Sequence, residues 1–264
     1  MLRCRKAKDT SVYAAALSTG LSFWRQQRGK PHICLLYTSA TDVRSKVFGK
    51  ITIDVSMTIL LMLLMAFELI GRAAHEWIGM GMFVLFIIHH ILNRNWSKNL
   101  FGGKYTPFRV LQTAVAILVL IFMLGSVISS ILISREVFAF MPISGGRAFG
   151  RMLHMICAYW GFVMLALHLG VHWNMIIGIA RKKCTEPSRA RRMVLRVLGV
   201  GIAGYGMYAF VHRGFPEYMF LRTQFVFFDF DEPIFLFFLN YLAIMGLFIW
   251  IGYYLTRLSH LRHN

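Results

Sequence analysis

The chain has 264 residues, of which 57% are hydrophobic and 15% charged, and its formal net charge is +18. Long apolar blocks exclude an ordinary soluble domain, and basic residues placed between such blocks are typical of membrane topology rather than of nucleic-acid binding. The four cysteines form no Cys-x-x-Cys pattern, which argues against zinc, thioredoxin-like chemistry and covalent c-type haem. We therefore expect a polytopic membrane protein that binds no nucleic acid.

The first 46 residues differ from the rest of the chain. They carry nine Lys or Arg and two Asp, and they lack the clean apolar core and cleavage site of a signal peptide. The segment Cys34–Ser39 resembles translated sequencing-adapter read-through. We expect residues 1–46 to be a basic leader that is disordered or non-native, with the native chain beginning near residues 44–50. The alternative is a basic arm held near anionic lipid.

Six apolar stretches have about the length of 20 residues that a helix needs to cross a bilayer. The fourth is longer than one span requires, and the fifth is short and rich in glycine. Its Gly199-x-Gly201-x-x-Gly204 pattern matches a dinucleotide fingerprint, but no strand precedes it, so we interpret it as a packing face. The stretches are Ile51–Ile70, Ala73–Asn93, Val110–Ile133, Phe149–Ile179, Leu195–Val211 and Phe235–Leu255.

These stretches predict an all-α membrane protein. We expect a transmembrane four-helix haem-binding bundle in residues 47–182, and two further spans with an outer loop in residues 183–264. Lys and Arg gather after the second and fourth stretches and at the C-terminus, which favours the cytoplasmic side for these connections. We therefore expect a multi-pass protein of the bacterial inner membrane with both termini in the cytoplasm.

Histidines occur at equal spacing in the second and fourth stretches. His75 and His89 are 14 residues apart, and so are His154 and His168. In a helix, 14 residues rise about 21 Å and return to within about 40° of the starting direction. Because the two spans run in the same direction, the spacing predicts His75 level with His154, and His89 level with His168. Two facing pairs of this kind predict axial ligands for two stacked b-type haems.

Further side chains are candidates for supporting roles. His90 is an alternative to His89, although it points to a different side of the helix. His172 is expected beside the inner haem, where it can bond a propionate or a quinone, or else at the lipid headgroups. We interpret Asp54 as an N-cap or interface residue and Glu68 as a proton or quinone group. The basic residues at the outer ends can pair with propionates or anchor the helices at the interface; they are Arg72, Arg147 and Arg151.

Seven short motifs lie between residues 46 and 182. They are Thr52–Val55, Ala74–Trp77, His89–Asn93, Gly103–Pro107, Pro142–Gly146, His154 with Ala158–Gly161, and His168–Trp173. Together they resemble a bacterial family of four-helix, di-haem membrane cytochromes encoded beside flavin-attachment systems, the flavinylation-associated membrane cytochromes. The histidine arrangement is also similar to that of the cytochrome b subunit of respiratory bc complexes. The resemblance implies bis-histidine haem b and electron transfer to extracytoplasmic flavin-bearing partners.

The expected function is electron transfer across the bilayer by a di-haem cytochrome b. The donor would be a quinone or a cytoplasmic-side protein, and the acceptor an extracytoplasmic redox partner, such as a flavoprotein. The sequence contains no catalytic triad, nucleotide loop or flavin-attachment motif, so we expect a redox subunit rather than a complete enzyme. The alternatives are a proton- or metal-coupled transporter and a membrane di-iron oxygenase, although the His-x-x-His-His box of those oxygenases is missing.

Overall fold

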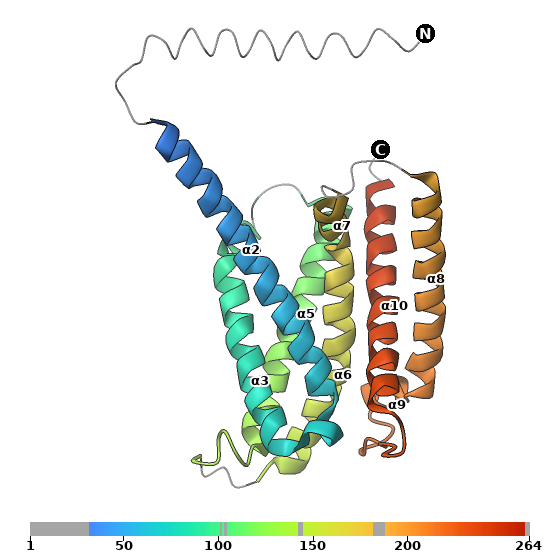
Figure 1. Cartoon of the computed structure of the whole chain (residues 1–264). Coiled ribbons are helices and arrows are strands. Elements are labelled where there is room, and N and C mark those ends of the chain that lie inside the picture. Colours follow the sequence, from blue (N-terminus) through green and yellow to red (C-terminus); the bar gives the residue numbers. More distant parts are fainter. Residues whose placement is uncertain (1–31, 101, 103–104, 142–144, 182–187, 262–264) are drawn as a thin grey trace, which may run out of the picture. The chain divides into compact units, whose positions relative to one another are not determined.

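The computed structural model of the chain describes residues 32–100, 102, 105–141, 145–181 and 188–261 (Figure 1). All regular secondary structure in these residues is α-helical. By their internal contacts, residues 1–52 and 53–264 form two compact units, and helix α2 runs from one into the other. The helices are α2 (His32–Met65), α3 (Phe67–Leu92), α4 (Arg94–Lys98), α5 (Pro107–Ile133), α6 (Arg147–Val171), α7 (Trp173–Arg181), α8 (Arg189–His212), α9 (Phe215–Met219) and α10 (Ile234–Leu261).

The unit of residues 1–52 contains the predicted leader. Residues 32–46 form the first part of α2. A helix is compatible with this segment, because the sequence from His32 to Phe48 contains neither glycine nor proline. The remainder of the predicted leader, residues 1–31, lies outside the described residues.

Six helices among the described residues are long and apolar enough to cross a membrane. Large apolar side chains such as Val197 and Phe235 are exposed along them, as expected for surfaces that face lipid. The predicted all-α membrane class is therefore confirmed. The segments that could span a membrane are Val47–Met65, Phe67–Leu92, Pro107–Ile133, Arg147–Val171, Arg189–His212 and Ile234–Ser259.

Two predicted helix boundaries were wrong. The first apolar stretch was predicted to run to Ile70, but α2 ends at Met65 and α3 begins at Phe67, with only the buried Ala66 between them. The residues on both sides of this turn are apolar, so hydropathy does not reveal it. The fourth stretch was predicted to run to Ile179, but α6 ends at Val171 and the shorter α7 follows after His172.

Helix α6 is central to the packing within residues 53–264. It packs against α5 and α10, and α10 packs in turn against α8. A buried cluster that includes Phe162, Phe215 and Ile244 joins α6, α9 and α10, so the two C-terminal spans are built onto the four-helix part. A second apolar cluster joins α2, α3 and α5; its buried members are Met57, Met82, Phe86 and Val119.

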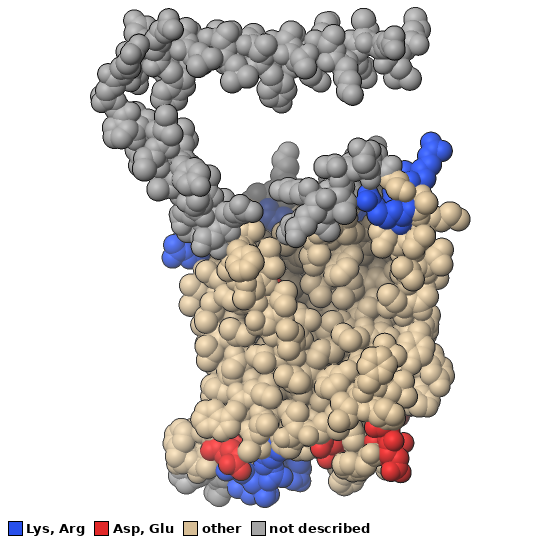
Figure 2. Space-filling view, in the orientation of Figure 1, with Lys and Arg blue, Asp and Glu red and all other residues tan. Residues whose placement is uncertain are grey.

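Charged side chains lie near the ends of the helices. On the face drawn in Figure 2, acidic and basic side chains gather at the end that holds α9, whereas basic side chains stand out at the opposite end. At the α9 end, Arg213 after α8 forms an ion pair with Glu232 before α10, which ties the two ends of the connecting segment together. The apolar face between the two ends matches the hydrocarbon layer of a bilayer.

Glycine allows a close approach of α8 to α10. A Cβ atom at Gly206 would overlap the backbone of Ala243. The predicted packing face holds only in part, because Gly199 lies near Trp250 whereas Gly201 and Gly204 have open space around them. Small residues let helices approach closely within a membrane, where there is no hydrophobic drive to press them together.

We predict that Gly206→Ala destabilises the protein, because the added methyl group must push α8 away from α10. Overpacking of this kind costs about 1–3 kcal/mol. Thermal unfolding in detergent measures the loss. Gly201→Ala on the same helix is the matched control, and it should leave the unfolding temperature unchanged or slightly raised; equal effects of the two substitutions would contradict the close contact.

Candidate functional site

The first histidine layer, called the outer layer here, consists of His75 on α3 and His154 on α6. The two rings meet across the bundle in a T-shaped arrangement, with their centroids 6.0 Å apart and their planes at 74°. Both side chains are half-buried, and the edge of Phe67 packs against the His75 ring at 5.1 Å. The structure thus brings together two residues that are 79 positions apart in the sequence (154 − 75 = 79).

The neighbours of His154 favour a proton on Nδ1. The Ser129 hydroxyl donates its hydrogen to the Ser126 carbonyl oxygen at 2.9 Å, so its oxygen can only accept from His154 Nδ1–H, 3.1 Å away. The Ser130 hydroxyl oxygen lies 3.4 Å from the same nitrogen. The Nε2 atom of His154 is therefore the unprotonated one, which is the form that binds a metal.

The separation of the outer pair fits axial ligation of one metal ion. Metal–imidazole bonds are about 2 Å long, which places the centroids of two rings on opposite sides of one ion about 6 Å apart. Among the described residues, no three His, Cys, Asp or Glu side chains are grouped to hold a bare ion. A haem iron needs only two protein ligands, because the porphyrin nitrogens fill its other positions.

The second layer, called the inner layer here, consists of His89 on α3 and His168 on α6. His89 Nδ1–H donates to the Asp54 carboxylate of α2 over 2.7 Å. A carboxylate can only accept, so His89 Nδ1 carries the proton of this bond, and the amide nitrogen of Asn93 lies 3.4 Å from His89 Nε2, near the outer limit of hydrogen bonding. His168 lies within electrostatic range of both His89 and Asp54.

His172 adjoins the inner layer at the end of α6. Its ring centroid is 4.8 Å from that of His168, and its Nε2 lies 3.4 Å from the Gln112 amide nitrogen of α5. Burial lowers the pKa of His172, while the nearby Asp54 carboxylate raises it and His89 lowers it further. His172 therefore lies where the sequence analysis expected it, beside the inner pair.

His90 is placed differently from His89. Its side chain is exposed, and its Nδ1–H donates to the Phe86 carbonyl oxygen of its own helix at 2.9 Å. His89 is half-buried and is held by a residue of another helix. The geometry therefore favours His89 over His90 as a ligand that faces α6.

Two buried ring nitrogens lack a partner among the described residues: Nδ1 of His75 and Nδ1 of His168. An unpaired buried polar atom is costly, and such atoms concentrate at functional sites. Each layer therefore contains one histidine with a firm hydrogen-bond partner and one without. A group bound at Nε2 would leave these two Nδ1 atoms as they are, so the spacing of the outer pair is the observation that fits a bound group.

The residue beside His75 fastens α3 to the loop after α5. The Glu76 carboxylate accepts a hydrogen bond from the Ser134 hydroxyl at 2.6 Å and from the backbone N–H groups of residues 135, 136 and 137 at 3.0–3.1 Å. The Ser134 oxygen in turn accepts from the Phe138 N–H at 2.9 Å. These bonds fix the outer end of α3 beside α5 and so help to place His75 opposite His154.

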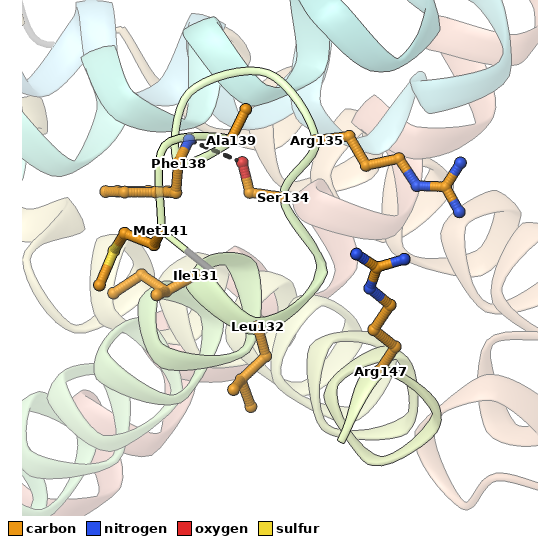
Figure 3. A pocket seen from close by; sticks show the side chains of 8 residues that line it. All are labelled: Ile131, Leu132, Ser134, Arg135, Phe138, Ala139, Met141 and Arg147. Carbon is orange, nitrogen blue, oxygen red and sulfur yellow. Dashed lines mark hydrogen bonds between the residues drawn. The ribbon is translucent and has the colours of Figure 1, made fainter. Parts of the chain in front are cut away.

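The same loop borders a cavity of about 210 Å³ (Figure 3). Arg135 of the loop and Arg147 at the start of α6 line it, and Figure 3 shows their guanidinium groups on the same side of the loop. Arg72 and Arg151, the other basic residues expected to pair with propionates, are exposed near this end of α3 and α6. An anionic group at this end would therefore meet several positive charges.

Sequence reasoning missed part of this site. Asp54 lies well inside α2, which excludes the N-cap alternative but not the interface one, and its carboxylate bonds His89 of α3. Ser129 and Glu76 were not singled out, although polar side chains within spans usually have a function. Glu68, expected as a proton or quinone group, is exposed at the start of α3.

We predict that Glu76→Ala loosens the loop after α5. Hydrogen bonds to a charged acceptor contribute about 1.5–3 kcal/mol each, so amide exchange at residues 135–137 should speed up at least roughly tenfold. Hydrogen exchange read by mass spectrometry measures this. Glu68→Ala, on the other side of the kink that Gly71 makes in α3, is the control, and unchanged exchange in the Glu76 variant would show that the carboxylate does not hold the loop.

No protein-family model, curated protein or solved structure matches this chain. The resemblance in residues 46–182 therefore remains an expectation. What the protein does has to follow from the chemistry of its two histidine layers.

Proposed function

We propose that the protein is a di-haem cytochrome b that carries electrons across a membrane. The observation that carries this proposal is the facing pair of His75 and His154, at a separation suited to two axial ligands of one iron. The Ser129 hydroxyl supports it, because it leaves His154 Nε2 free to bind a metal.

The inner layer would hold the second haem through His89 and His168. The two layers are 14 residues apart along each helix, which corresponds to about 21 Å. The apolar cluster that includes Met82 and Phe86 lies on α3 between them. A pair of redox centres at this separation would span much of a hydrocarbon layer about 30 Å thick.

The haems would supply one-electron redox chemistry, which protein side chains alone do not provide here. The residues of the chain would bind and orient them: the four histidines as ligands, Ser129 and Asp54 as partners of two of those ligands, and the surrounding helices as a barrier to water. The basic residues Arg72, Arg147 and Arg151 are exposed at the outer end, where they would pair with propionates.

The distribution of Lys and Arg among the connections supports a direction for electron transfer across the membrane. Basic connections favour the cytoplasmic side, which would put the inner layer near the cytoplasm of a bacterial cell and both termini on that side. The donor would be a quinone or a cytoplasmic-side protein. The acceptor would be an extracytoplasmic redox partner, and the resemblance suggests one that carries flavin. In this role the chain is a subunit of an oxidoreductase system.

We predict that the purified protein contains about two b-type haems per chain, because each layer offers two axial histidines. A dithionite-reduced minus oxidised visible spectrum identifies the haem type, and the pyridine haemochrome gives the haem content. A colourless protein from haem-sufficient cells would contradict the proposal and favour a transporter. Iron without porphyrin would favour a di-iron oxygenase.

Single substitutions then assign the haems to the layers. His75→Ala should remove the outer haem and His168→Ala the inner one, so that each variant retains about one haem. His212→Ala is the control, because His212 ends α8 and stacks on Tyr208, away from both layers. If the two ligand variants retained both haems, the ligand assignment would be wrong.

A further inference from the structure

The hydrogen-bond acceptors of the two layers differ in charge. In the inner layer, His89 Nδ1–H donates to the Asp54 carboxylate over 2.7 Å. In the outer layer, His154 Nδ1–H donates to the neutral Ser129 hydroxyl oxygen over 3.1 Å. A bond to an ionised acceptor is shorter and about twice as strong as one between neutral groups. The bond to the Asp54 carboxylate is accordingly the shorter of the two.

The charge of the acceptor at Nδ1 changes the basicity of Nε2, the nitrogen that would bind iron. A carboxylate that accepts from Nδ1–H draws the proton away from the ring and makes Nε2 a stronger electron donor. A stronger donor stabilises oxidised iron relative to reduced iron, and hydrogen bonding to the ligands is one of the means by which a protein sets haem potential. The nearby negative charge of Asp54 acts in the same direction.

The other polar and charged side chains near the two layers do not reverse this difference in ligand basicity. His75 and His168 have no partner at Nδ1 among the described residues, so no hydrogen-bond acceptor there changes the basicity of either ring. Glu76 acts electrostatically on His75, but its carboxylate bonds the Ser134 hydroxyl and backbone N–H groups and does not bond a ring nitrogen of the outer layer. Basic residues occur at both ends of the bundle.

We propose that Asp54 makes the inner haem the one of lower potential, so that electrons pass downhill from the inner to the outer layer. This inference rests on the proposed function. The haem held by His89 and His168 would give up one electron, and the haem held by His75 and His154 would accept that same electron. No proton transfer is required. Asp54 acts through His89 and is a positioning and tuning residue, without contact to substrate.

Redox titration of the full-length protein in detergent tests this inference. The His75→Ala protein should retain only the inner haem, and the His168→Ala protein only the outer one, so each midpoint can be measured alone. We expect the lower midpoint in the His75→Ala protein. Adding Asp54→Asn should raise that midpoint while the haem content stays the same, and Asp54→Glu, which keeps the charge, should raise it less.

The controls separate tuning from structural damage. In the His168→Ala protein, Asp54→Asn should leave the outer midpoint unchanged, and Ser129→Ala should shift it less than Asp54→Asn shifts the inner one. An outer haem of lower potential would overturn the inference even if the Asp54 variants lost haem, and so would an inner midpoint that Asp54→Asn leaves unmoved. Absence of haem from the unmodified protein would instead overturn the proposed function.

Discussion

A polar side chain within a bilayer has to find its hydrogen-bond partner inside the protein, because the hydrocarbon offers none. This constraint explains the principal polar contacts between the helices. Asp54 of α2 accepts from His89 of α3, Ser129 of α5 accepts from His154 of α6, and Glu76 of α3 accepts from the loop after α5. Two of these contacts join neighbouring helices and the third joins α3 to a loop, so satisfying the polar groups also positions the histidines.

In these contacts, the histidines and their hydrogen-bond acceptors lie on different helices. Helices α3 and α6 carry the paired histidines, whereas α2 and α5 carry the acceptors that orient one ring in each layer. A ligand and its acceptor on separate helices make ring orientation a property of the assembled bundle. This arrangement suits a group that binds between helices, since the bundle itself then preorganises the site.

The spans and the histidine spacing could be predicted from the sequence because they depend on length and helical period alone. The turn at Ala66 could not, because apolar residues flank it on both sides. The hydrogen-bond partners of His89 and His154 depend on how α2 and α5 are rotated about their axes. A long apolar sequence does not determine this rotation. The role of Gly206 was hidden for the same reason, since only the packed structure shows which glycines meet a neighbouring backbone.

The contact between α6 and α10 has a consequence for the inner layer. Gly170 lies two residues from both His168 and His172, and a Cβ atom there would overlap the backbone of Ile249. From the other side, a Cβ atom at Gly252 would come within 2.7 Å of the Leu167 carbonyl oxygen. The helix that bears the inner ligand thus rests backbone to backbone on the last span. In the proposed function, the C-terminal helix would therefore support the geometry of the inner layer from outside the four-helix part.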